Sequence, residues 1–438
     1  MAETASKGCY NLYLKCKMER IIIKNIGPIR QADFGINKVN VFIGPQSSGK
    51  STIAKIVSFC QWLEKYIIIN QGAETIDRDF FKNQLLSFHG FNKFFKENSY
   101  IEYESENILF KFNNIQSFDI ILKDGFKNGV MNKVAYIPSE RNILSMPNIS
   151  TFQMENNYIR SFMFDWLGMR SKYNSSHSYS ILNLGVNYYY DEKRGDIIRL
   201  VDGNELALSE ASSGLQALIP MLVYINYVTK WIYENDADIS YDKYTSLQKA
   251  LLKDVFKENE AEFNLDEALK IPEVRANINS LLNRMSKLSE MKSSDGNAVT
   301  ELIERIGKPH STKLTIEEGE MNIFPSTQYE LVKAVIGALN FERGDTLLLT
   351  THSPYIMTSL NNLIQSGNSF RENPEMASTI GAVIPKACWL NYSDVNAWKV
   401  DDGIITSIKD DEYQLISSDA LDEASEKISG DFSKLIEE

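Results

Sequence analysis

Short apolar runs alternate with longer segments of helical period along most of this chain. Residues 21–36 predict two strands, and residues 39–43 predict a third, whose unbroken apolar run is typical of a strand buried on both faces. Residues 51–66 then repeat their apolar positions at the period of a helix. This order of strand, loop and helix predicts an α/β fold.

The middle of the chain predicts several short strands and two helices. Residues 100–112 alternate apolar and polar positions around Ser105-Glu106-Asn107, which predicts a hairpin. Further strands are expected at residues 118–122, 134–137, 188–200 and 206–208, and helices at residues 80–95 and 152–167.

The second half begins with a segment of helical character. Residues 228–302 carry apolar side chains at three- and four-residue steps and predict two or more helices in a compact insertion. Strands are expected again at residues 314–318, 346–352, 387–390 and 395–400. Residues 419–436 predict a helix with one apolar and one acidic face, which either packs on its own core or docks on another subunit.

Composition narrows the class of protein. The chain has 438 residues, 43% of them hydrophobic, which is enough for a large core divided into two or three lobes. It has no apolar run long enough to span a membrane, and the polar start Met1–Lys7 does not predict a signal peptide. Its four cysteines form no C-x-x-C pair, so we expect no zinc site and no disulfide framework, and a reducing, cytoplasmic location.

The charge is distributed unevenly along the chain. The formal net charge is −12, and residues 401–438 alone hold 12 acidic and 3 basic side chains. The remainder is therefore close to neutral and does not predict the clustered Lys and Arg that tight, non-specific DNA binding needs. DNA contact is disfavoured rather than excluded.

Residues 44–52, G-P-Q-S-S-G-K-S-T, form a complete phosphate-binding loop, G-x-x-x-x-G-K-[ST]. Glycines allow the backbone to turn tightly, so that its N–H groups point at phosphate oxygens. Lys50 is expected to reach the β- and γ-phosphates of ATP, and the Ser51 hydroxyl to bind Mg²⁺. The expected nucleotide-binding residues are Gly44, Gln46, Ser47, Ser48, Gly49, Lys50, Ser51 and Thr52.

The second half supplies the polar groups that hydrolysis needs. The predicted strand at residues 314–318 ends in two carboxylates, and we assign Glu317 to the metal and Glu318 to the attacking water. The strand that follows ends at His352, which is expected at the same edge of a parallel sheet and so near the γ-phosphate. Ser213 and Gly214 precede an apolar helical run, which indicates either an anion site at a helix N-terminus or ordinary capping.

Taken together, these motifs resemble the ABC-type ATPases of the SMC/RecF/Rad50 branch, and within it the OLD-type ATPases. That group includes ATPase subunits of bacterial anti-phage systems of the PARIS and Septu type. Three further stretches are similar to the same group: Lys24-Asn25-Ile26-Gly27-Pro28-Ile29, Val134-Ala135-Tyr136-Ile137-Pro138-Ser139-Glu140-Arg141 and Glu318-Gly319-Glu320-Met321-Asn322-Ile323-Phe324-Pro325. The resemblance covers roughly residues 20–220 and 310–400.

The resemblance implies an ABC-type head with an antiparallel β-subdomain and a helical insertion. Its expected parts are an N-terminal extension (1–17), a first ATPase lobe (18–227), the insertion (228–302), a second lobe (303–410) and an acidic C-terminal helix (411–438). It also implies a homo-oligomer in which Ser213 of one copy closes on ATP held by another.

The chain departs from the family pattern at several positions. Glu317 stands where the family usually has Asp, and the signature is Ser-Gly-Leu-Gln rather than Ser-Gly-Gly-Gln. Gln84 is only a weak candidate for the family's glutamine loop. These departures predict slow hydrolysis.

No effector domain is recognisable, because neither a Toprim-like metal motif, nor an H-N-H cluster, nor a hydrolase elbow is present. We therefore expect a sensor ATPase of an anti-phage system that holds or activates a separate nuclease or toxin. The first alternative is a DNA-maintenance ATPase of the RecF or SMC kind that binds DNA directly. The second alternative, the ATPase subunit of a membrane transporter, is disfavoured by the missing glutamine loop.

Overall fold

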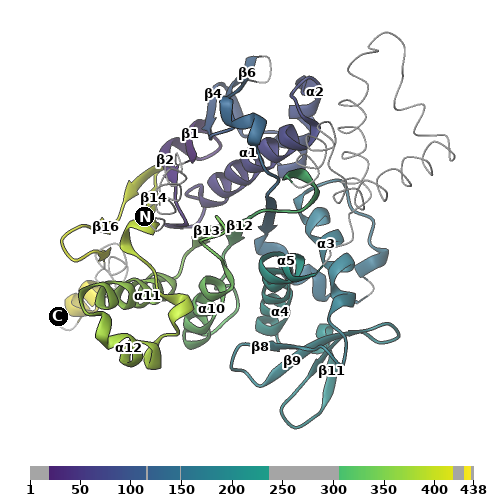
Figure 1. The fold of residues 1–438 in the computed structure, drawn as a ribbon, viewed down its shortest axis with the longest axis vertical. Coiled ribbons are helices and arrows are strands. Elements are labelled where there is room, and N and C mark those ends of the chain that lie inside the picture. The colour runs from purple at the N-terminus through teal and green to yellow at the C-terminus, as the bar shows by residue number, and fades with distance from the viewer. Residues whose placement is uncertain (1–18, 115–116, 148, 236–304, 418–428, 436–438) are drawn as a thin grey trace, which may run out of the picture.

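The computed structural model describes residues 19–114, 117–147, 149–235, 305–417 and 429–435. Within them, one large sheet has the strand order β6-β5-β4-β1-β2-β15-β14-β3-β13-β12-β7 (Figure 1). Its strands are β1 Glu19–Ile26, β2 Ile29–Ile36, β3 Val39–Ile43, β4 Phe95–Glu104, β5 Ile108–Asn114, β6 Ser117–Leu122, β7 Lys133–Ile137, β12 Thr312–Glu317, β13 Thr346–Thr351, β14 Val395–Asp401 and β15 Ile404–Ser407.

The sheet has a parallel and an antiparallel part. Strands β14, β3, β13, β12 and β7 are parallel to one another, and β6, β5, β4, β1 and β2 form an antiparallel series. Strand β15 joins the two parts, antiparallel to β14 and parallel to β2. Thr351 pairs with Ile43, and Thr350 pairs with Glu317, so the carboxyl ends of β3, β13 and β12 meet at one edge. The predicted α/β fold with antiparallel strands is confirmed.

Helices on both faces of the parallel strands explain why those strands are apolar throughout. Phe42 of β3 packs with α1 (Lys50–Asn70), whereas Val41 packs on the opposite side with α4 (Ser213–Asn226), α10 (Pro325–Ala338) and α11 (Pro354–Glu372). Successive residues of a strand point to opposite faces, so each strand contributes to both cores.

A second, smaller sheet lies beyond α4, at the foot of the molecule in Figure 1. It has the order β11-β10-β9-β8, and its strands are β8 Tyr179–Ile181, β9 Val186–Asp191, β10 Gly195–Arg199 and β11 Glu205–Ala207. The other short elements are α2 Arg78–Phe81, α3 Tyr158–Met169, α5 Ile232–Glu234, α12 Ala377–Val383, β16 Lys409–Asp410 and β17 Leu415–Ile416.

Three sequence predictions about local structure need correction. The strand expected at residues 387–390 is wrong, because Lys386–Cys388 is a short 3-10 helix. The helix expected from residue 152 begins at Tyr158, where the Asn157 side chain accepts a hydrogen bond from the Arg160 N–H and caps it. The helix expected at residues 80–95 is divided into α2 and a π-helical turn, Lys82–Ser87, and ends before β4.

Two other predictions fall largely outside the described residues. Of the expected helical insertion at residues 228–302, residues 228–235 are among the described residues, and the rest of that prediction lies outside them. Of the C-terminal helix, residues 429–435 are described and are helical, with Phe432 and Leu435 exposed.

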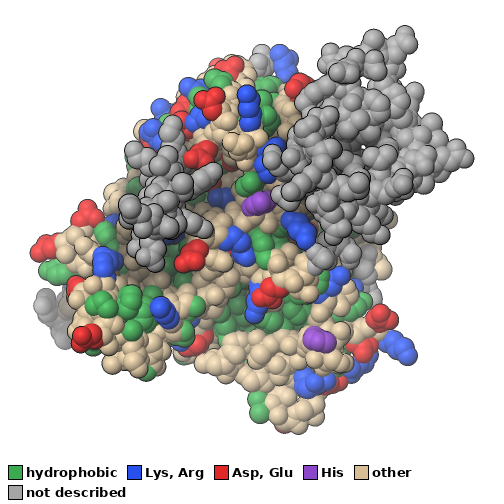
Figure 2. All heavy atoms as spheres, in the orientation of Figure 1, with side chains coloured by type: hydrophobic (Ala, Val, Ile, Leu, Met, Phe, Trp, Pro, Cys, Tyr) green, Lys and Arg blue, Asp and Glu red, His purple; other side chains and the backbone are tan. Residues whose placement is uncertain are grey.

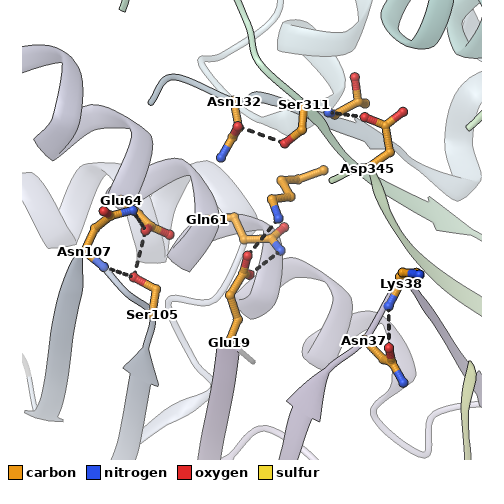
Figure 3. Close-up of polar contacts among 12 residues, drawn as sticks. Glu19, Asn37, Lys38, Gln61, Glu64, Ser105, Asn107, Asn132, Ser311 and Asp345 are labelled. Carbon is orange, nitrogen blue, oxygen red and sulfur yellow. Dashed lines mark hydrogen bonds and ion pairs between the residues drawn. The ribbon is translucent and has the colours of Figure 1, made fainter. Parts of the chain in front are cut away.

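A buried polar network joins the antiparallel strands to the start of β12 (Figure 3). Lys313 donates to Glu19 Oε1 at 2.8 Å, and Gln61 of α1 donates to Glu19 Oε2 at 3.0 Å. The neighbouring Glu64 carboxylate accepts hydrogen bonds from Tyr103, Ser105 and Asn107. These contacts hold α1 against the sheet near the start of β12, at the end of the parallel strands opposite to the phosphate-binding loop.

Among the described residues, none of the helices combines the length and the apolar character needed to cross a membrane.

Candidate functional site

The phosphate-binding loop connects β3 to α1 and needs its glycines. Gly49 has φ 110°, and a Cβ there would lie 2.3 Å from Ile29 Cδ1. A Cβ on Gly44 would lie 2.2 Å from the Val400 carbonyl oxygen. Any larger residue would therefore displace the loop from β2 or β14, which explains both glycines physically.

A cavity of about 640 Å³ opens beside this loop. Six of the predicted nucleotide-binding residues line it, together with Glu318 and His352 from the ends of β12 and β13. Pro28, Lys55, His89, Gly90, Phe91 and Phe94 complete the lining. The six loop and helix residues are Gln46, Ser47, Gly49, Lys50, Ser51 and Thr52.

The other two predicted loop residues lie just behind this lining. Gly44 and Ser48 do not line the cavity, but both contact Lys50, which does. Lys50 Nζ lies 2.9 Å from the Gly44 carbonyl oxygen and 3.5 Å from Ser48 Oγ.

Lys50 is held by its own loop. Its ammonium group donates to the carbonyl oxygens of Gly44 and Pro45, at 2.9 and 2.8 Å, and the side chain is buried. Burial lowers its pKa to about 8, although Glu318 and Glu320 act in the opposite direction. A bound phosphate would favour the charged ammonium and offset this cost of burial.

Glu318 and His352 meet beside Lys50. His352 Nε2 lies 3.5 Å from Glu318 Oε1, and His352 Nδ1 lies 3.5 Å from Lys50 Nζ. Glu318 has φ 45°, a left-handed backbone conformation that is unusual for a glutamate, and its N–H donates to the Thr350 carbonyl oxygen at 2.9 Å. The strained residue at the end of β12 thus directs its carboxylate into the cavity.

Glu317 is almost fully buried and does not line the cavity. Tyr136 donates a hydrogen bond to its Oε1, and Ser139 lies 3.5 Å from its Oε2. Burial raises its pKa, with Lys55 acting in the opposite direction. A divalent cation near this carboxylate would favour its ionised form.

Of the two predicted Mg²⁺ ligands, Ser51 lines the cavity, whereas the buried Glu317 does not. Among the described residues, no group of three or more His, Cys, Asp or Glu could hold a metal alone. Mg²⁺ in such sites takes one or two protein ligands, and phosphate oxygens and water supply the rest. The hydroxyl of Ser51 and the carboxylate of Glu317 are hard oxygen donors of this kind.

Arg141 braces the turn that follows β12. The side chain is fully buried, and it donates to the backbone oxygens of Glu317, Glu318 and Gly319 at 2.9, 2.8 and 3.3 Å. Burial lowers its pKa to about 10, against the attraction of Glu320 and its neighbours. It therefore fixes the backbone that carries Glu317, the predicted metal ligand, and Glu318, the predicted catalytic carboxylate.

Ser213 and Gly214 lie outside the cavity. Ser213 is exposed at the start of α4, and the preceding Ser212 caps the helix by accepting a hydrogen bond from the Leu215 N–H at 3.4 Å. A Cβ on Gly214 would lie 2.7 Å from the Asn322 carbonyl oxygen, so α4 begins against the turn after β12. Within one chain, this signature does not reach the phosphate-binding loop's cavity.

Several residues at the site were not among the predicted ones. Tyr136 and Arg141 belong to the 134–141 stretch, whose resemblance to the family was the available signal. Lys55 lies one turn after the loop, with Nζ 4.0 Å from the centre of the Tyr158 ring, and no motif marks it. His89 is buried, and its desolvation lowers its pKa to about 3.

Gln84, the weak glutamine-loop candidate, does not line the nucleotide cavity. It lies in the π-helical turn and faces a second cavity of about 270 Å³ that is lined also by Trp62, Tyr158 and Asp165. Ser139, two residues beyond the end of β7, lies 3.5 Å from Glu317 Oε2.

The comparisons with known proteins give only weak likenesses. No protein-family model and no curated protein matches the chain. The SMC head domain from Thermotoga maritima is 10% identical, covers 89% of this chain and 98% of its own, and has a TM-score of 0.36. RecF of the RecFOR pathway, solved as RecF-ATPrS, is 12% identical, covers 90% and 99%, and has a TM-score of 0.30. An ATP-binding cassette of an ABC transporter, MJ1267, is 11% identical, covers 91% and 92%, and has a TM-score of 0.31.

Proposed function

We propose that this protein is an ABC-type ATPase that binds Mg·ATP at the loop 44–52 and hydrolyses it with Glu318 and His352. One observation carries the proposal: residues from three separate parts of the chain, Lys50, Glu318 and His352, converge on one cavity of about 640 Å³. Because each group serves hydrolysis in a different way, their convergence supports phosphoryl transfer to water better than simple nucleotide storage.

Each residue has a distinct part in the proposed reaction. The loop N–H groups and Lys50 bind the triphosphate, and Lys50 exchanges its bonds to Gly44 and Pro45 for phosphate oxygens. Glu318 orients the attacking water and accepts its proton. His352, between Glu318 and Lys50, contacts the γ-phosphate and senses its loss. Mg²⁺, bound through Ser51 and Glu317, would neutralise phosphate charge.

The position of Ser213 supports assembly through ATP. Since Ser213 is exposed and outside its own chain's cavity, a second copy is needed to bring it to the nucleotide. In this proposal ATP joins two copies, and hydrolysis releases them.

The narrower proposal is a sensor subunit of an anti-phage defence system that holds a separate effector. Its support is the resemblance of residues 24–29, 134–141 and 318–325 to OLD-type ATPases. Direct action on DNA, as in a RecF- or SMC-like ATPase, is the second candidate. On the face in Figure 2, basic and acidic side chains are interspersed, which favours the first candidate over tight, non-specific DNA binding.

The test uses Glu318→Gln, in which ATP binds and persists. Its mass in solution is measured with and without Mg·ATP, alone and with the protein encoded beside it. An ATP-dependent increase in mass that includes the neighbouring protein supports the effector-holding switch. A monomer with ATP bound contradicts the composite site. Turnover is measured separately in wild type, where stimulation by duplex DNA in a salt-dependent way supports the second candidate.

A further inference from the structure

Glu320 lies in the turn between β12 and α10, two residues after Glu318. Its Oε1 accepts a hydrogen bond from the backbone N–H of His352 at 2.6 Å. That N–H belongs to the residue just beyond the end of β13, on the neighbouring strand. This bond fixes the peptide that carries the His352 ring.

The position of the His352 ring depends on this peptide. Its two nitrogens lie 3.5 Å from Lys50 Nζ and 3.5 Å from Glu318 Oε1, and its side chain is only 29% exposed. A shift of the backbone by a fraction of an ångström would move the ring away from both. Misplacement on this scale is enough to slow a reaction without preventing substrate binding.

The second oxygen of Glu320 indicates that the carboxylate does more than hold a turn. Glu320 Oε2 is buried and has no hydrogen-bond partner in the described part of the chain. Asp345, at the other end of β13, differs: both of its oxygens accept hydrogen bonds, from the Thr312 N–H at 2.8 Å and the Asn340 N–H at 2.9 Å among others. An unpaired buried carboxylate oxygen is costly, and such costs concentrate at functional sites.

We infer that Glu320 is a positioning residue for hydrolysis, which holds His352 between Lys50 and Glu318 through its bond to the His352 N–H. The inference rests on the proposed function for its effect on turnover, but the hydrogen bond can be tested without turnover. Glu320 itself does not line the cavity.

The experiment compares wild type, Glu320→Ala and Glu320→Gln in Mg·ATP turnover and ATP binding. We expect Glu320→Ala to lower kcat between about tenfold and about 100-fold, with ATP affinity changed by less than about threefold. Glu320→Gln keeps an oxygen that accepts from the His352 N–H, so it should recover most of the rate. Glu330→Ala, which removes an ion pair to Lys333 on α10, is the matched control and should be unchanged.

A double-mutant cycle separates positioning from any independent role. In a His352→Ala background, Glu320→Ala should lower the rate by less than about twofold further, because its target is already absent. A full effect in that background, wild-type turnover by Glu320→Ala, or a Glu320→Gln rate as low as that of Glu320→Ala would overturn the inference.

Hydrogen exchange gives an outcome that does not require activity. In Glu320→Ala, the peptide containing residue 352 should exchange its amide hydrogens faster than in wild type or Glu330→Ala. Unchanged exchange overturns the inference even for an inactive protein. A wild type that releases no phosphate, with exchange altered as expected, contradicts the proposed function instead.

Discussion

Strand β12 has a buried polar cluster at each end, and the two clusters differ in how completely their groups are paired. At the start, Lys313 and Glu19 pair at 2.8 Å, and Glu64 nearby accepts three hydrogen bonds, of which Figure 3 draws those from Ser105 and Asn107. At the end, Glu318 has a strained backbone, and one buried oxygen of Glu320 has no hydrogen-bond partner among the described residues. The first cluster completes its bonds within the chain, whereas the second lies beside a cavity of about 640 Å³.

This difference distinguishes a structural role from a functional one. Groups that serve stability satisfy one another, because an unpaired buried charge costs free energy. Groups that serve a ligand are left incomplete until the ligand arrives. Changes at the end of β12 should therefore affect nucleotide chemistry, and changes at its start should affect stability.

The largest effect is expected at the phosphate-binding loop. Lys50→Ala removes the only described lysine bonded to the loop's own carbonyl oxygens and so the partner of the β- and γ-phosphates. We expect ATP binding to fall below detection in calorimetry while the thermal midpoint stays near that of wild type. Unchanged ATP affinity in this variant would show that the loop 44–52 does not bind the phosphates of ATP.

The next effect separates binding from assembly. Ser213→Glu places a negative charge where the second copy's triphosphate is proposed to lie, outside this chain's own cavity. ATP affinity of the monomer should be retained, and the ATP-dependent increase in mass should disappear in light scattering. Assembly at wild-type strength would show that the signature does not face ATP.

At the start of β12 the effect should be on stability. Lys313→Met leaves Glu19 buried without its cation, at a cost of about 3 kcal/mol near neutral pH. Burial acts to raise the pKa of Glu19, but Lys313 and its hydrogen bonds keep that pKa below 4.5. A carboxyl group whose pKa is lower in the folded than in the unfolded protein stabilises the folded state at pH values above its unfolded-state pKa. This stabilisation is lost as the pH falls through the folded-state pKa.

Urea unfolding at several pH values measures this effect. The gap between wild type and Lys313→Met should be widest near neutral pH and should narrow as the pH falls below about 4.5. Phosphate release per folded molecule should stay at the wild-type level. If Lys313→Met lost turnover without losing stability, the start of β12 would not have the purely structural role assigned to it.

The smallest effect is expected at Glu64. Burial, followed by the charge of Glu19, raises its pKa, so its contribution to stability is present at acid pH and is lost as the pH rises through the raised value. Glu64→Gln has no charge to bury. Its free energy of unfolding should therefore equal that of wild type at acid pH and exceed it increasingly toward alkaline pH. The gain should stay below about 1 kcal/mol, because the substitution replaces one of the oxygens that accept hydrogen bonds. A constant difference across pH would show that Glu64 does not titrate as described.

The sequence predicted the parallel strands and the loop well, because long apolar runs and G-x-x-x-x-G-K-[ST] are local signals. It also placed Glu318 and His352 at strand ends, and parallel topology then brought them together. It did not reveal that Arg141 braces the backbone after β12 or that Glu320 bonds His352. Those contacts join residues far apart in the chain, and no local pattern encodes such pairings.

The start of α3 and the segment 386–388 were misjudged for a different reason. Asn157 capping begins α3 six residues after the apolar pattern does. At residues 386–388, a short apolar run adopts a 3-10 turn in which Cys388 packs against α10. Tertiary packing and single caps decide such boundaries, and periodicity alone does not report them.

The most direct test is phosphate release by wild type and Glu318→Gln side by side at saturating Mg·ATP, with bound ATP measured in both. The account predicts turnover by wild type, a rate at least about 100-fold lower in Glu318→Gln, and equal ATP binding. Equal rates in the two proteins, or no ATP bound by wild type, would contradict the claim that this cavity is an ATP-hydrolysing site.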